Sequence, residues 1–200
     1  MHDLHQEFFD KLAGEWDLSF TAEDLERLTR VVNRLQITVG YDILDLGCGT
    51  GILFDMLRRR VGDDGTVTGI DFSLQMADRA HRNFPFDNVN VVDGDVVALP
   101  FRGSCFDMAI AFSSFPHFSD RPKALAETRR VLKPGAAFHI VHLMSSRETS
   151  DMHHRVGGVV AHDSLPGVDE MTKLLSTTGF VHVKIEDKPG IYLASAVNPR

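Results

Sequence analysis

Cysteine is scarce in this chain of 200 residues, which contains only Cys48 and Cys105. Two cysteines are too few for a disulfide framework or for an all-cysteine metal site, so we expect a protein of the reducing cytoplasm. The first ten residues, MHDLHQEFFD, have no basic segment followed by an apolar one, which argues against a secretory signal. No apolar run approaches the length of a membrane-spanning helix, and we expect no membrane partner.

Positive charge is also in short supply. Lysine and arginine number 21 against 28 acidic residues, which leaves a net charge of −7. Proteins that bind nucleic acid usually present a broad positive surface, so this balance argues against a nucleic-acid partner. A small molecule is the expected partner, and the oligomeric state is left open. The length and the ordinary globular composition suit a single domain over residues 1–200.

Short apolar runs alternate with helical patterns from residue 41 onward. The runs are YDILDL, TVTGID, NVNVVD, CFDMAIAF and AAFHIVHLM. Strands and helices that alternate at this spacing predict a parallel sheet with crossover helices. Two further runs, VHVKIED and IYLASAV, are joined by only KPG, so they should form an antiparallel hairpin. The predicted fold is α/β, with a doubly wound, mostly parallel sheet of seven strands and an antiparallel C-terminal hairpin strand.

The remaining segments should surround this sheet. We divide the chain into a helical cap, a core, a lid insertion and a closing helix with hairpin, at residues 1–40, 41–144, 145–168 and 169–200. In the cap, Phe8, Leu12 and Trp16 recur every four residues, as on one face of a helix. The lid is longer than a minimal connection. The apolar stripe of Phe8, Phe9 and Trp16 predicts that cap and lid together roof a substrate pocket.

A glycine-rich turn, GCGTG at residues 47–51, follows the first predicted strand. Glycines at such a turn let the backbone approach a ligand and offer N–H groups at a helix start. A dinucleotide site needs a third glycine where Ile52 stands, so a pyrophosphate ligand is disfavoured. Asp71 ends the second strand, where a carboxylate accepts hydrogen bonds from two ribose hydroxyls. Alternatively, Asp71 caps the helix that begins near Ser73.

These features resemble the class I S-adenosylmethionine-dependent methyltransferases over about residues 40–198. The similar segments are ILDLGCGTG, TGIDFSLQM, GDVVALPF, FDMAIAFSSFPHF and RRVLKPGAAFHIV. The resemblance implies a Rossmann-like fold and an enzyme that uses S-adenosylmethionine and releases S-adenosylhomocysteine. It implies methyl transfer to a small molecule that the sequence does not identify.

The resemblance also implies which residues would hold the methyl donor. Its methionine part would lie against Gly47, Cys48, Gly49 and Gly51, with Asp45 near the amino group. Asp71 would hold the ribose, and Asp95 and the backbone of Val96 would contact the adenine. Phe72 and Met76 would flank the adenine or, as the alternative, pack their helix on the sheet. Ala111 and Phe112 would line the floor.

Histidines are the candidate bases near the methyl group. A sulfonium methyl is already activated, so a base is needed only when the nucleophile arrives protonated. His117, in the loop after the fourth strand, and His142, near the end of the fifth, are the catalytic candidates. His117 could instead lie in a plain surface turn. His153 and His154 in the lid are expected to line the substrate pocket.

Two other functions stay open. One is a regulatory or scaffold protein that binds S-adenosylmethionine without turnover. The other is a histidine-ligated metal-binding protein, because a helix over 156–163 would place His154 and His162 on one face. No tight H-x-H or H-x-x-x-H spacing is present, so no metal ligand is assigned.

Overall fold

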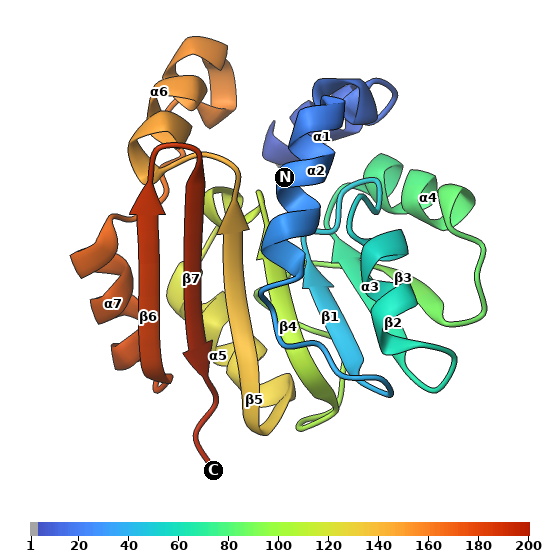
Figure 1. Cartoon of the computed structure of the whole chain (residues 1–200). Coiled ribbons are helices and arrows are strands. Elements are labelled where there is room, and N and C mark those ends of the chain that lie inside the picture. The colour runs from blue at the N-terminus through green and yellow to red at the C-terminus, as the bar shows by residue number, and fades with distance from the viewer. Residues whose placement is uncertain (1–3) are drawn as a thin grey trace.

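Seven strands form one sheet in the computed structural model, which describes residues 4–200 (Figure 1). The strands are β1 (Asp42–Leu46), β2 (Thr66–Asp71), β3 (Val89–Asp93), β4 (Phe106–Phe112), β5 (Leu132–His142), β6 (Val181–Lys188) and β7 (Ile191–Val197). The α-helices are α1 (Leu4–Leu12), α2 (Ala22–Val32), α3 (Phe54–Val61), α4 (Leu74–Asn83), α5 (Arg121–Val131), α6 (Ser146–Val156) and α7 (Val168–Thr177). Three short 3₁₀ turns are η1 (Trp16–Ser19), η2 (Phe115–His117) and η3 (Gly158–Val160).

The strand order across the sheet is β3-β2-β1-β4-β5-β7-β6. Strands β1 to β5 are parallel, whereas β7 pairs antiparallel with both β5 and β6. The predicted seven-stranded α/β sheet and its antiparallel hairpin are therefore confirmed. The order reverses between β1 and β4, and ligands of such sheets bind outside the carboxyl ends of the strands at this switch point.

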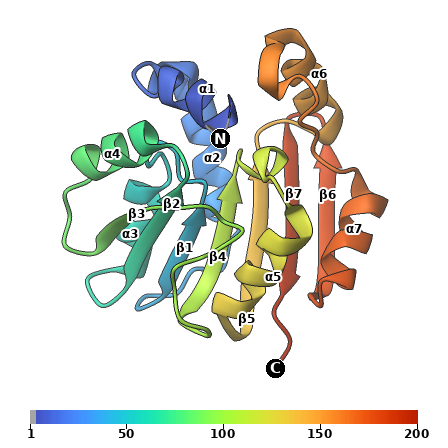
Figure 2. The same ribbon diagram turned by 180° about the vertical axis from the view of Figure 1, so that it is seen from behind.

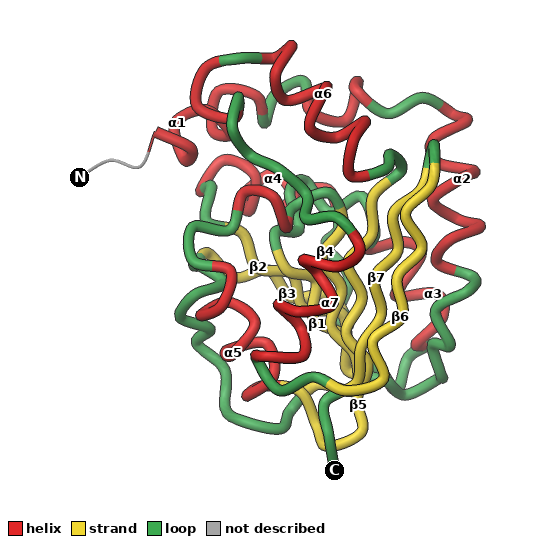
Figure 3. The backbone as a smooth tube through the Cα atoms, turned by 90° about the vertical axis from the view of Figure 1, so that its left-hand side faces the viewer, coloured by secondary structure: helices red, strands yellow, loops and turns green. Residues whose placement is uncertain are grey.

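Helices cover both faces of the sheet, which Figure 2 shows from behind and Figure 3 from the side. Apolar side chains alternate along β1, so Ile43 packs among α2 and α3 on one face and Leu44 packs among α5 and α7 on the other. Both side chains are fully buried. Each face thus has its own core, and the turns at the strand ends are held by rigid layers on both sides.

The first helical pattern is interrupted, contrary to the single helix predicted from Phe8, Leu12 and Trp16. Helix α1 ends at Leu12, and Trp16 begins the separate turn η1. Gly14 lies between them and disfavours a continuous helix.

The lid also differs from the prediction. It contains the regular helix α6, whose capping box joins Ser145 and Glu148, and no helix spans 156–163. Helix α6 stops at Val156 because Gly157 has a φ of 73°, a conformation that glycine adopts at little cost. The rings of His154 and His162 nevertheless lie 6.3 Å apart, because the chain folds back through η3.

Strand β6 departs from strict alternation near its start. His182 has a φ of 55°, and the pairing with β7 shifts register between Val181 and Lys184. This irregularity turns Val181 outward, and its side chain is 37% exposed.

Helix α1 lies above the carboxyl ends of the strands, beside the segment that follows α6, whereas α2 of the cap packs on a face of the sheet (Figure 1). Phe9 of α1 packs with Met76 of α4 and Val160 of η3 in a small apolar cluster. Asp10 accepts hydrogen bonds from the Ser73 hydroxyl at 2.5 Å and from the Gln75 N–H at 3.2 Å. The cap is thus fastened both to the lid and to the start of α4.

Candidate active site

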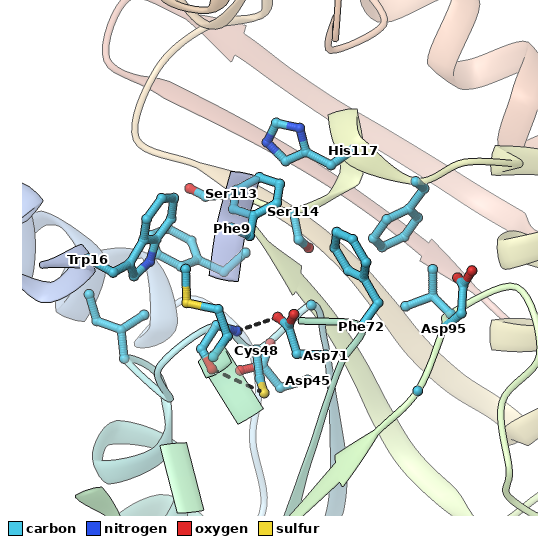
Figure 4. A pocket seen from close by; sticks show the side chains of 18 of the residues that line it. Phe9, Trp16, Asp45, Cys48, Asp71, Phe72, Asp95, Ser113, Ser114 and His117 are labelled. Carbon is cyan, nitrogen blue, oxygen red and sulfur yellow. Dashed lines mark hydrogen bonds between the residues drawn. The ribbon is translucent and has the colours of Figure 1, made fainter. Parts of the chain in front are cut away.

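A pocket of about 860 Å³ opens at the carboxyl ends of β1, β2 and β4. The lining residues are Phe9, Trp16, Phe20, Asp45, Gly47, Cys48, Gly49, Ile52, Asp71, Phe72, Met76, Gly94, Asp95, Val96, Phe112, Ser113, Ser114, His117, Phe118 and Ser119. Figure 4 shows Asp45, Cys48 and Asp71 close together, with Phe9 and Trp16 of the cap above them and Asp95 at the opposite end.

The glycine turn after β1 forms one wall. Gly47 and Gly49 have φ values of 70° and 54°, which favour glycine. A Cβ atom on Gly47 would lie 2.5 Å from Cβ of Ser114, so no larger residue fits between the ends of β1 and β4. A Cβ on Gly51 would instead meet the ring of Phe54 at 2.7 Å. Gly51 therefore permits close packing of α3 and does not line the pocket, unlike the prediction.

Asp45 is the most unusual side chain of the pocket, because it is a carboxyl that is only 1% exposed. Its Oδ1 atom has no hydrogen-bond partner among the residues that the structure describes. Burial, and secondarily the neighbouring Asp71, raises the pKa of Asp45 to about 8. A buried carboxyl oxygen without a partner is costly, and a cationic donor entering the pocket would satisfy it.

Asp71 holds the turn in shape. Its Oδ2 accepts the N–H of Gly49 at 2.7 Å (Figure 4). Its Oδ1 accepts the N–H of Ser73 at 2.9 Å. Burial raises its pKa to about 6, although both backbone hydrogen bonds oppose the shift. The helix cap proper is Ser73, whose hydroxyl accepts the N–H of Met76. Because a carboxylate offers about four acceptor positions, ribose hydroxyls could still bind Asp71.

The far end of the pocket is flat and mostly apolar. Phe72, Met76 and Val96 line it, and Met76 and Val96 are buried. Asp95 is exposed at the rim, and its Oδ1 accepts the N–H of Val97 at 3.1 Å. This arrangement suits a planar ring with an exocyclic amino group at its edge.

His117 lies over the mouth of the pocket, at the end of η2 (Figure 4). Its Nδ1 donates to Oδ2 of Asp163 at 2.6 Å, so it does more than occupy a surface turn. Burial lowers the pKa of His117, although the carboxylate of Asp163 works in the opposite direction. At neutral pH the ring is uncharged.

The other catalytic candidate, His142, is absent from the pocket lining. It is 2% exposed, its Nε2 has no partner among the described residues, and its ring lies 6.3 Å from that of Tyr192. Burial lowers its pKa to about 3. The position near the strand end was predicted correctly, but β7 and its Tyr192 enclose the side chain, so we assign His142 no contact with substrate.

Several predicted lining residues also lie elsewhere. His153 is buried and donates from Nδ1 to the backbone oxygen of Asp163 at 2.6 Å, whereas His154 is exposed on the far side of α6. Phe8 packs in the cap cluster, and Ala111 is fully buried within the sheet core. These residues were predicted from their position in the chain near the pocket mouth. Neighbouring residues on a helix or strand point in different directions, so such a position does not place a side chain in the pocket.

Sequence reasoning missed seven lining residues, which are Phe20, Ile52, Gly94, Ser113, Ser114, Phe118 and Ser119. Four of them come from the run SSFPHFS directly after β4, so the strand-end rule contained the signal. Ser113 has a φ of 52°, which turns the chain sharply at the pocket floor. Phe20 gave no signal, because it reaches the pocket only through the path of η1.

Two features of the structure bear on the alternative functions. In the part of the chain that the structure describes, no group of three or more histidine, cysteine, aspartate or glutamate side chains is placed to hold a metal ion. Across residues 4–200, no helix is both long and apolar enough to cross a membrane.

Known methyltransferases are similar to this chain in sequence. Residues 43–135 match the family described as a methyltransferase domain. The O-methyltransferase cnsE of Penicillium expansum is 34% identical over 184 residues, which cover 87% of this chain and 66% of that protein. A 2-phytyl-1,4-naphtoquinone methyltransferase of Nostoc sp. is 41% identical over 101 residues, which cover 48% of this chain and 44% of that protein. Either relative is thus matched over less than two thirds of its own length.

The fold has a close counterpart among solved structures. A chain in the complex between the Trm112 methyltransferase activator of Haloferax volcanii and a methyltransferase has a TM-score of 0.83 and 20% identity. The alignment covers 96% of this chain and 98% of that chain. At this identity the similarity concerns the fold alone.

Proposed function

The chain belongs to the class I S-adenosylmethionine-dependent methyltransferases, and from this premise we propose that it transfers a methyl group from S-adenosylmethionine to a small organic molecule. The observation that carries the proposal is Asp45, a buried carboxyl whose free oxygen faces a glycine turn at the switch point of the sheet. The name of the Nostoc relative supports a small-molecule acceptor.

The pocket residues fit the methyl donor part by part. The amino group would be held by Asp45, and the narrow passage at Gly47 and Gly49 would admit the methionine chain. Asp71 would accept the ribose hydroxyls, and Phe72 with Met76 would sandwich the adenine. Asp95 would accept the adenine amino group at the rim. The bound donor supplies an electrophilic methyl group on a sulfonium.

The protein would contribute chiefly by positioning and desolvation. Phe9, Trp16 and Phe20 of the cap would exclude water from the space above the glycine turn. When both reactants are held in line in such a space, much of the entropy loss of bringing them together occurs on binding and no longer adds to the barrier of the reaction. His117 at the mouth would accept a proton when the acceptor carries one.

Binding of S-adenosylhomocysteine tests the proposal directly. Trp16 is the only tryptophan of the chain and lines the pocket, so its fluorescence should report binding without a label. Replacing Asp71 with asparagine should weaken binding by about 2 kcal/mol, roughly thirtyfold, because the ribose loses a charged acceptor.

The matched control is Asp78→Asn, which removes an exposed carboxylate from α4 and should leave the affinity unchanged. Tight binding of NAD with no response to S-adenosylhomocysteine would overturn the proposal. Binding without methylation of any acceptor in a metabolite pool would favour the regulatory or scaffold alternative.

A further inference from the structure

One carboxylate above the pocket gathers three histidines from separate segments. Asp163, in the loop after η3, accepts Nδ1 of His117 at 2.6 Å and Nε2 of His5 at 3.1 Å through Oδ2. Its backbone oxygen accepts Nδ1 of His153 at 2.6 Å. The side chain of Asp163 is 15% exposed, and that of His117 is 11% exposed. Transfer of a methyl group to an unprotonated nucleophile would need none of these contacts.

These contacts fix which nitrogen of His117 carries the proton. A carboxylate only accepts hydrogen bonds, so Nδ1 of the neutral ring is the donor and Nε2 keeps its lone pair. Nε2 makes no hydrogen bond to any of the residues 4–200, and the side chain lines the pocket. The ring packs against those of Phe9 and His153, and each of these ring centroids lies 4.9 Å from that of His117. His117 is thus held in one orientation with a proton acceptor free.

Burial favours this neutral, proton-accepting state of His117, and the carboxylate of Asp163 opposes it. His5 of α1, His153 of α6 and Asp163 face the ring, and His142 of β5 is near enough to influence it. Burial lowers the pKa of His117. Burial alone would raise the pKa of Asp163, but the hydrogen bond and charge of His117, with His5, hold it below its ordinary value. At neutral pH the pair is a carboxylate beside an uncharged imidazole.

The rest of the pocket mouth narrows the chemistry of the acceptor. The aromatic side chains that line the pocket together with His117 are those of Phe9, Trp16, Phe20, Phe112 and Phe118. No lysine or arginine is among the lining residues, so a phosphorylated or carboxylated acceptor would find no cationic partner there. Aromatic walls instead suit a flat, uncharged molecule.

We infer that Asp163 is a positioning residue that holds His117 as the general base for an acceptor with a phenol-type hydroxyl. This inference rests on the proposed methyl transfer and adds the class of acceptor. The hydroxyl oxygen forms a bond to the methyl carbon while the carbon–sulfur bond breaks and leaves its electron pair on sulfur. The hydroxyl proton moves to Nε2 of His117 and later to water. Asp163 stabilises the imidazolium that forms, as the buried carboxylate does in other histidine–aspartate pairs that act as a general base.

The binding of 4-nitrophenol tests this pair without any turnover. The protein is saturated with S-adenosylhomocysteine, and the visible absorbance of the phenolate reports where the proton resides. Below the pKa of free 4-nitrophenol, the wild type should bind the phenol with a larger ionised fraction than in solution, because His117 takes the proton. Asp163→Asn should reduce this excess at least fivefold, and His117→Ala should abolish it.

Imidazole ¹⁵N NMR supplies a second readout. In the wild type His117 should be protonated at Nδ1, whereas in Asp163→Asn this preference should weaken and the pKa of His117 should fall. Asp151→Asn, an exposed carboxylate on α6, is the matched control and should change neither measurement. An unaltered ionised fraction and tautomer in Asp163→Asn would overturn the inference.

The two proposals fail in different ways. Trp16 fluorescence that does not respond to S-adenosylhomocysteine would refute the methyl-donor site. A normal response to S-adenosylhomocysteine, with 4-nitrophenol either unbound or not ionised, would refute the His117–Asp163 pair alone.

Discussion

The binding of the methyl donor should depend on pH through Asp45. In the ligand-free chain, burial raises the pKa of this carboxyl to about 8, so the group is mostly protonated at neutral pH. An ammonium group beside Oδ1 requires the ionised form, and binding must therefore release a proton below pH 8. The ionised fraction falls from about one half at pH 8 to about one hundredth at pH 6, which predicts a roughly fiftyfold weaker affinity at pH 6.

Calorimetry can count this proton. Titrating the protein with S-adenosylhomocysteine at pH 6.5, in two buffers with different enthalpies of ionisation, should give a release of about one proton per ligand. The affinity should level off above pH 8, because Asp45 is then mostly ionised before the ligand binds.

Two variants separate Asp45 from other carboxyls. Asp45→Asn should bind more weakly at pH 8 and should lose both the proton release and the pH dependence between pH 6 and 8. Asp95→Asn, which changes an exposed carboxylate at the other end of the pocket, should keep both. Absence of proton release in the wild type, or its persistence in Asp45→Asn, would refute the assignment of Asp45 to the amino group.

Three further predictions concern the fold around the site. Burial holds the folded-state pKa of His142 below its ordinary value, so the contribution of the neutral ring to stability is present above about pH 6.5 and is lost as the pH falls toward 3. In urea denaturation, the free energy of unfolding of the wild type should therefore fall by about 2 kcal/mol more between pH 7 and 5 than that of His142→Leu. Gly47→Ala should abolish S-adenosylhomocysteine binding, because its Cβ would collide with Ser114. Gly40→Ala is the control, since Gly40 has a φ of 85° but nothing within 4 Å of an added Cβ; it should cost only about 1 kcal/mol of stability and leave binding intact, and equal affinities of the two variants would contradict the tight packing at Gly47. Val160→Asp should separate the lid from α1 and speed hydrogen exchange in residues 4–12, and unchanged exchange there would refute the packing of the cap on η3.

The sheet was predictable because its signals are local. Continuous apolar runs such as that ending at Phe112 predict buried strands, and a three-residue link admits only a hairpin. The glycine turn and Asp71 follow from their positions at strand ends. Trp16 was assigned to the wrong element because four-residue spacing continues across Gly14, where the helix itself does not.

The mouth of the pocket was less predictable because it depends on contacts distant in sequence. Asp163 is 46 residues from His117, and neither local sequence predicts the hydrogen bond between them. The position of His142 on its strand suggested an accessible side chain. The residue that encloses it, Tyr192, belongs to β7, which is the last strand in the chain and lies far from His142 in sequence. Residues with clear local signals were therefore found, whereas those defined by tertiary neighbours were not.

Helix α1 and turn η1, which supply Phe9 and Trp16 to the pocket wall, contribute no strand to the sheet. Neither segment takes part in the pairing of the seven strands, although Asp17 of η1 accepts a hydrogen bond from Thr50 of the glycine turn. The aromatic wall that these two segments supply is thus built by chain outside the sheet, whereas the glycine turn and Asp71 are held at the ends of β1 and β2.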